Sequence, residues 1–313
     1  MPVPSALFKA KAREVLRGRW QTALLIALAV NLPSLLVQGI SAFSGTDLIA
    51  RLESLVITIS RDGMMTQQAL VGGIQEIFSD SGVLISLGFT FLAWLITPCL
   101  SLGMIHWLLG RLRKNEGDEG FPTVFSRLNI SHKAMGLLLT KALIIGLWML
   151  PGLVLTGLSV LPLRNAGPTN AEILSAMNTS MILVYGGLAV MAVPGIMAAL
   201  RLAMADILLS DHPEKGVFAC VRESKAMMNR RKGQLFSLEL SFIFWYLAEM
   251  LVSSLLAGMG SGILSLMVQM LAGLFLSVYI QAAVCAFYEA VRKLPSPSAD
   301  TPTPGPEEEE ALN

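Results

Sequence analysis

Six long apolar stretches constrain this chain more than any other feature. About 20 consecutive apolar residues are needed to cross the hydrocarbon core of a bilayer as a helix. A backbone in lipid must satisfy its own hydrogen bonds, and the alternating polar pattern of a membrane barrel is missing, so each stretch is predicted to be a helix. The stretches lie at about residues 20–38, 83–109, 134–161, 181–209, 235–256 and 263–288. We therefore predict an all-α integral membrane bundle of six transmembrane helices.

Composition agrees with a membrane protein. Hydrophobic residues make up 54% of the 313 residues and charged residues only 14%, whereas a soluble domain usually has about 25% charged residues. The formal net charge of +1 gives no bias toward nucleic acid, so no nucleic-acid partner is expected. Cys99, Cys220 and Cys285 are far apart and are interpreted as small apolar residues.

The positions of lysine and arginine predict the orientation. Eighteen of these cations precede the first span, lie between spans two and three or four and five, or follow span six. The opposite side holds only Arg51, Arg61 and Arg164. Because loops rich in Lys and Arg remain in the cytoplasm, both termini are predicted to be cytoplasmic.

The segment before the first span allows two interpretations. A basic stretch ahead of an apolar one is typical of a cleaved signal peptide. However, Lys9 and Arg13 repeat every four residues beside an apolar stripe that includes Phe8, Ala12 and Leu16. We therefore predict that residues 1–19 form a basic amphipathic helix on the inner membrane surface, ahead of a retained first span.

The remaining segments complete the predicted organisation. Residues 20–294 form the six-helix domain, with a short helix expected near residues 65–77. Residues 295–313 are rich in proline and glutamate and are predicted to be disordered. The chain is interpreted as three helical hairpins, each introduced by a surface helix. For the third of these surface helices we predict Asp211 as N-cap and an end near Met228.

Ionisable residues inside the predicted spans are the candidate functional residues, because burying a charge in lipid is costly. Lys141, Arg201, Asp206 and Glu239 are predicted to lie about 5–12 Å from the inner boundary, and Glu249 about 21 Å from it. Arg201 is expected to meet Glu239 or a lipid phosphate. Structural ion pairs, a substrate or proton path, and an anionic-lipid headgroup site all fit this layer. Glu249 lacks an evident cation and is predicted to share an inward stripe with Glu239, so it is the strongest candidate.

Prolines occur in each of the first four spans, at Pro33, Pro98, Pro151 and Pro194. Proline can kink a membrane helix and mark a hinge, although it is also ordinary in membrane helices. These positions are therefore candidate hinges.

Motifs for catalysis are missing from the sequence. It contains no P-loop, GxGxxG, HExxH, GxSxG or paired CxxC pattern. None of the three histidines has a neighbour at metal-ligand spacing. We therefore expect no cofactor, no metal and no enzymatic activity.

The block that begins at Asp211 reads "DHPEKGVFACVRESKAMMNRRKGQLFSLELSFIFWYL". Together with Tyr279 and the late pair Phe287 and Tyr288, it resembles the signature of a bacterial membrane family catalogued as domain of unknown function 975. The chain departs from that pattern at Asp206 and Ile207, where the family often has Pro-Tyr, and at Val278, where it tends to have proline.

The resemblance implies a polytopic protein of the bacterial inner membrane and no particular activity. The basic surface helices and the lack of a catalytic motif lead us to expect a non-enzymatic protein in the lipid bilayer. It is expected to act through a membrane protein partner or lipids, such as anionic headgroups, as a scaffold or envelope-homeostasis factor. The alternative is a small-molecule or lipid transporter that uses Glu249 and Glu239.

Overall fold

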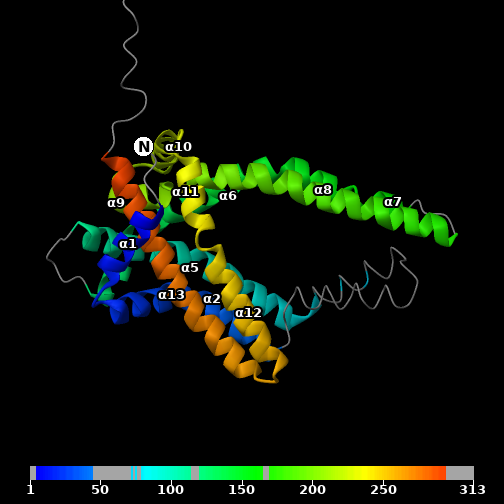
Figure 1. Ribbon diagram of the computed structural model, residues 1–313, viewed down its shortest axis with the longest axis horizontal. Helices are drawn as coiled ribbons and strands as arrows, with labels where there is room; N and C mark the ends of the chain where they lie inside the picture. The colour runs from blue at the N-terminus through cyan, green and yellow to red at the C-terminus, as the bar shows by residue number, and fades with distance from the viewer. Residues whose placement is uncertain are drawn as a thin grey trace, which may run out of the picture.

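The computed structural model describes residues 5–44, 79–113, 120–164 and 169–293, together with Gly72 and Gln75. In these ranges the chain is helical and has no strand (Figure 1). The predicted tail at 295–313 lies outside the described residues. The predicted short helix at 65–77 does too, apart from Gly72 and Gln75, which are helical.

Six helical stretches are long and apolar enough to cross a membrane, and this confirms the predicted all-α, six-span fold. They are Trp20–Val37, Ser81–Leu112, Phe121–Pro162, Leu174–Asp211, Lys232–Leu256 and Met267–Arg292. The helices are α1 (Ser5–Leu16), α2 (Trp20–Ser44), α5 (Ser81–Leu112), η1 (Phe121–Phe125), η2 (Leu128–Ile130), α6 (Ser131–Gly157), α7 (Val160–Arg164), α8 (Asn170–Leu202), α9 (Ala205–Asp211), α10 (Val217–Met227), α11 (Lys232–Leu240), α12 (Ile243–Gly258) and α13 (Gly262–Arg292).

The spans pack as three successive antiparallel hairpins, α2 with α5, α6 with α8, and α12 with α13. A short helical segment precedes each hairpin, namely α1, the η1–η2 pair and α10. The α6–α8 pair is the closest, because Gly152 and Gly187 let the two backbones touch. A Cβ atom on Gly152 would lie 2.5 Å from the Gly187 carbonyl oxygen. Small residues allow this kind of contact between membrane helices.

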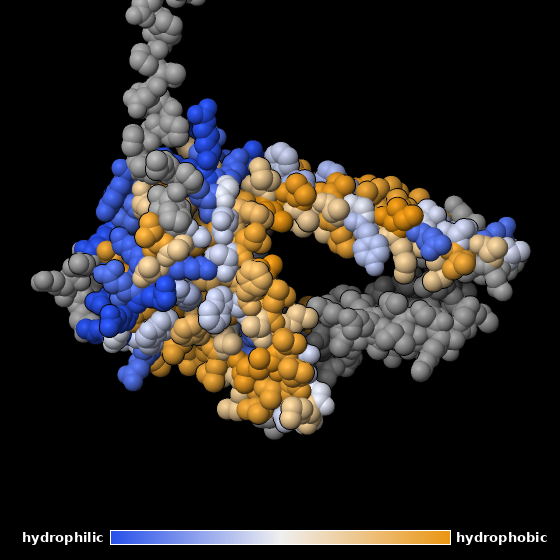
Figure 2. Space-filling model, in the orientation of Figure 1, coloured by the Kyte–Doolittle hydropathy of each residue, from blue (hydrophilic) through white to orange (hydrophobic). Residues whose placement is uncertain are grey.

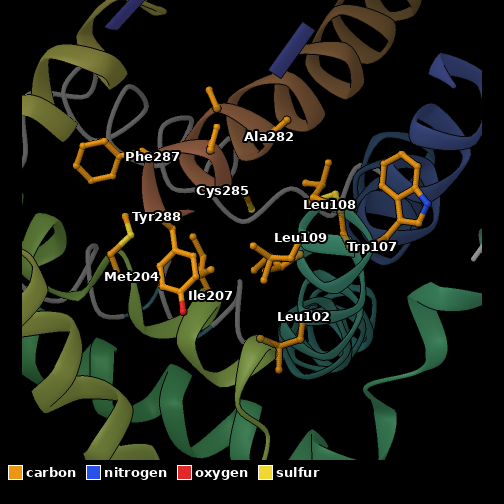
Figure 3. Close-up of a cluster of buried hydrophobic side chains, with 14 of the residues drawn as sticks. Leu102, Trp107, Leu108, Leu109, Met204, Ile207, Ala282, Cys285, Phe287 and Tyr288 are labelled. Atoms are coloured by element: carbon orange, nitrogen blue, oxygen red, sulfur yellow. The ribbon is translucent and has the colours of Figure 1, made fainter. Parts of the chain in front are cut away.

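Helices from distant parts of the chain pack together in one dense cluster of buried side chains, which we call the hub. It gathers side chains from α1, α5, α9, α10, α11 and α13, and Figure 3 shows part of it. The hub comprises Phe8, Ala12, Leu16, Leu102, Trp107, Leu108, Leu109, Met204, Ile207, Cys220, Val221, Leu235, Leu238, Ala282, Cys285, Phe287 and Tyr288.

The apolar stripe of α1 is buried in the hub. Phe8 packs edge-to-face on Phe287, with the ring centroids 5.3 Å apart. Ala12 and Leu16 are fully buried. The prediction that this stripe rests on the membrane surface is therefore wrong, because α13 covers it. Basic residues of α1 such as Lys11 and Arg13 remain exposed.

Beyond the hub the hairpins diverge. In Figure 1, α6, α7 and α8 extend away from the hub as one arm, while α12 and α13 extend in another direction. Hydrophilic residues gather at the hub end in Figure 2, and the diverging parts are mostly apolar. Leu143 and Ile182 on the arm are 74% and 71% exposed, and Phe244 on α12 is 75% exposed. This apolar, outward-facing surface is what a lipid-embedded protein presents.

Three of the six apolar stretches are interrupted between helices, the third of them at Leu158–Ser159 between α6 and α7. The other two breaks lie beside the hub, and neither of these lies at a proline. The fourth span is interrupted at Ala203–Met204, between α8 and α9, and the fifth at Ser241–Phe242, between α11 and α12. All four predicted hinge prolines lie inside continuous helices. Instead, each of these two breaks releases a backbone carbonyl that accepts a hydrogen bond from a side chain of another helix.

Candidate functional site

A network of charged and hydroxyl groups closes the hub on its polar side. The Arg113 guanidinium donates to both carboxylate oxygens of Asp211, at 2.6 and 2.9 Å, and also to Glu289 Oε1. Tyr288 and Arg292 of α13 donate to Asp211 Oδ2 at 2.9 and 3.1 Å. The Asp211 side chain is only 6% exposed, so α5, α9 and α13 are joined around a buried carboxylate.

The Asp211 carboxylate stabilises the charged form of its main partner. Hydrogen bonds to Asp211, and secondarily to Glu289, raise the pKa of Arg113 above its ordinary value against the opposing effect of burial. The prediction that Asp211 caps the next helix is wrong, because its carboxylate is committed to this network. It is the last residue of α9, and α10 begins at Val217 after Gly216.

Side chains of α10 and α1, two helices that contribute to the hub, donate to the carbonyls released at the two breaks beside it. Ser224 of α10 is fully buried, and its hydroxyl donates to the Arg201 carbonyl at 2.9 Å. Lys9 of α1 donates to the Ser241 carbonyl at 3.0 Å, and its ammonium lies 4.5 Å from the centre of the Phe242 ring. In an unbroken helix each of these carbonyls accepts from the residue four positions later. The breaks are therefore built-in features with dedicated partners.

A groove of about 500 Å³ lies beside the hub, over α5 and between α2 and α6. Apolar side chains dominate it, with hydroxyls from Ser34, Thr90 and Thr97. At one wall Lys141 Nζ lies 2.5 Å from Asp206 Oδ2. The side chains of these two residues are 23% and 37% exposed, so the pair faces the groove. An apolar cavity with a few fixed polar groups is the usual form of a binding site for a small apolar ligand.

The structure brings only two of the five predicted site residues together, Lys141 and Asp206. Arg201 lies over the Trp148 ring, 6.0 Å from its centroid, and not against Glu239, which was one of its two predicted partners. Its other predicted partner, a lipid phosphate, stays a prediction. Glu239 is exposed and Glu249 is half-buried. The break at Ser241–Phe242 separates them onto α11 and α12, so they do not lie on one continuous inward stripe. In the described ranges neither carboxylate has an ion-pair partner, and neither lines the groove.

Sequence reasoning missed several residues of this region. Asp211 was identified in the "DHPE" motif, but it was interpreted as the cap of the next helix. The motif does not indicate its partners on distant helices. Arg113 and Glu289 lie just at the ends of apolar stretches, where charges are ordinary. Ser224 carries no signal of its own, because a buried serine looks like any small residue. No group of His, Cys, Asp and Glu in the described part of the chain could hold a metal ion.

Comparison with known proteins gives a family and nothing finer. No curated protein and no solved structure matches the chain. A family described as "Protein of unknown function (DUF975)" matches residues 3–295. The match covers the whole hub and all six apolar stretches, including the "DHPE" and "RES" motifs. This multi-pass helical chain therefore belongs to the family of proteins of unknown function DUF975.

Proposed function

We propose that the protein is a non-enzymatic component of the bacterial cytoplasmic membrane that acts by binding a lipid or a membrane partner. Both termini and the hub lie on the cytoplasmic side in this proposal, because hydrophilic residues gather at the hub end (Figure 2) and exposed cations such as Lys11, Arg13 and Arg222 belong to helices of the hub. The protein works as a scaffold, with the groove beside the hub as its binding site.

The observation that carries this proposal is the Lys141–Asp206 pair in the wall of an otherwise apolar groove. A charged pair in a membrane-spanning region is costly to maintain unless it is well paired or functional. Here the pair is held together at 2.5 Å but left partly exposed to an open space. The groove thus suits a ligand with an apolar body and one polar group, such as a lipid or a polar residue on a partner helix.

Native mass spectrometry in a mild detergent tests this proposal. The wild-type protein is expected to retain a lipid or partner mass. Leu138→Trp fills the groove from α6 and should remove most of that mass. Leu147→Trp places the same bulk on an exposed part of α6 outside the groove and should leave the mass in place. Equal retention by both variants, or none by the wild type, would contradict the proposal.

A second candidate function is transport of a small molecule or lipid. The breaks beside the hub, at Ala203–Met204 and Ser241–Phe242, favour it, because discontinuous helices form substrate and ion sites in many transporters. Glu239 lies next to one break, and Glu249 lies further along the same span. In proteoliposomes, flux of a fluorescent lipid that is lost in Glu239→Gln and Glu249→Gln would support transport. Unchanged flux in both variants would reject a role of the two glutamates in transport, and no flux in the wild type would reject transport of this lipid.

A further inference from the structure

A second cavity lies on a different face of α6, where α10 crosses it. Its volume is about 460 Å³. From α6 it is lined by Thr140, Leu143 and Ile144, which share one side of the helix at i, i+3 and i+4. The groove described above uses other α6 residues, including Leu138 and Lys141. The two sites are therefore lined by different residues.

Two unpaired cations stand at the α10 side of this cavity. Phe218, Arg222 and Lys225 are spaced by four and three residues, so they lie on one stripe of α10. Arg222 and Lys225 are exposed, and within the described residues neither has an ion-pair partner. The neighbouring Glu223 does not neutralise Arg222, because its carboxylate binds Lys215 Nζ at 2.7 Å.

The opposite side of α10 fixes the helix in place. Cys220, Val221 and Ser224 are buried in the hub, and burial raises the pKa of the Cys220 thiol. Val217 packs against Gly136 of α6, so closely that a Cβ on that glycine would lie 3.3 Å from a Val217 methyl group. The cations are thus held at the point where α6 enters the apolar region, and not on a loose surface loop.

The cavity has a cationic part and an apolar part, which match the phosphate and the acyl chains of a phospholipid. Arginine and lysine at the membrane interface attract phosphate headgroups, and each cation contributes a several-fold gain in affinity for anionic lipids. Phe218 is 78% exposed and Leu143 is 74% exposed, and both are large apolar surfaces beside the cations. An acyl chain would cover Leu143 and Ile144, while the phosphate would lie between Arg222 and Lys225.

We propose that the α6–α10 cavity binds an anionic phospholipid, with Arg222 and Lys225 holding its phosphate and Leu143, Ile144 and Phe218 covering its first acyl carbons. The proposal rests on the membrane location in the proposed function but not on the groove. A free phosphate compound would not use the apolar half of the cavity, so the ligand is committed to a lipid.

The test is a titration followed by native mass spectrometry, with phosphatidylglycerol and with phosphatidylcholine of the same acyl chains. The wild-type protein should prefer phosphatidylglycerol. The double variant Arg222→Gln/Lys225→Gln should lose about tenfold in affinity for phosphatidylglycerol and keep its affinity for phosphatidylcholine. The matched control Lys11→Gln/Arg13→Gln removes two exposed cations from α1 and should keep the preference.

Several outcomes would overturn this proposal. One is an equal affinity of the wild type for both lipids, and another is an equal loss in the α1 control, which indicates non-specific attraction. Competition by glycerol phosphate as effective as that of the lipid would assign the site to a soluble phosphate. Because both replaced cations are exposed, an unchanged melting temperature should confirm that the variant is folded. Loss of the groove ligand in Leu138→Trp is independent of these results, so failure of either proposal can be told from failure of the other.

Discussion

The hub and the diverging ends of the hairpins are built from the same helices but are held by different forces. In the hub, side chains from six helices are buried together, and a carboxylate that is 6% exposed is satisfied by three donors. On the α6–α8 arm, leucines and isoleucines are mostly exposed, and the two helices contact mainly each other. Lipid chains are as apolar as leucine, so apolar surface alone does not drive membrane helices together. The comparison teaches that a polar network joins helices at the hub end, whereas close backbone packing at glycines joins α6 to α8 on the arm.

The largest effect is expected from Asp211→Ala, which removes the carboxylate at the centre of the polar network that closes the hub. Arg113 and Arg292 would lose their shared carboxylate, and Arg113 would be left partly buried with Glu289 alone. Breaking a buried, hydrogen-bonded charge pair costs about 3 kcal/mol or more. Thermal unfolding in mild detergent should show a large fall in melting temperature. The control Glu214→Ala removes a carboxylate that is 68% exposed and should change little. Equal melting temperatures for the two variants would show that the hub network does not stabilise the fold.

An intermediate effect is expected from Gly152→Ala, which should loosen the arm without disturbing the hub. The added methyl group would collide with the Gly187 carbonyl and the Met191 backbone, and overpacking of this kind costs about 1–3 kcal/mol. Gly146→Ala on the same helix meets no atom within 4 Å and should be neutral or slightly stabilising. Hydrogen exchange in nanodiscs should rise in α6 and α8 peptides of Gly152→Ala only. A matching rise in α9 and α13 would mean that the arm and the hub are one cooperative unit.

The smallest effect is expected from Ser224→Ala, which tests the junction between the two regions. The Arg201 carbonyl would lose its hydroxyl donor inside a closed core, at a cost of about 1–2 kcal/mol. The control Ser175→Ala removes an exposed hydroxyl that binds within α8. We expect a modest fall in melting temperature for the first variant and none for the second. If Ser224→Ala is neutral, the break between α8 and α9 does not need its partner.

The spans could be predicted from sequence because each is a local property of about 20 residues, and length and apolar composition are sufficient to recognise it. The Lys141–Asp206 pair could also be anticipated, because depth along two helices places both groups in one layer. The positions of the breaks could not. Proline is the local signal for a break, yet Pro151 and Pro194 lie in continuous helices.

The ion-pair partners in the network beside the hub could not be predicted from sequence either. Asp211 and Glu289 are far apart in sequence, and nothing local indicates that Arg113 binds both. The same holds for Lys9, whose partner at Ser241 is 232 positions away. Such pairs follow from how the three hairpins meet, which the period and composition of one segment do not encode. The predicted position of Glu249 assumed that the fifth span is one continuous helix. The break at Ser241–Phe242 makes that assumption invalid.

The contacts of α1 also set an order of assembly. Phe8 needs Phe287, and the backbone carbonyl of Lys9 accepts from the Tyr279 hydroxyl at 3.4 Å, 270 positions later in the chain. Because α13 is synthesised long after α1, the apolar stripe of α1 cannot be covered until α13 has been made. Until α13 arrives, that stripe is free to rest on the membrane surface, as its amphipathic pattern suggests. The hub can therefore be completed only after all six apolar stretches have been synthesised.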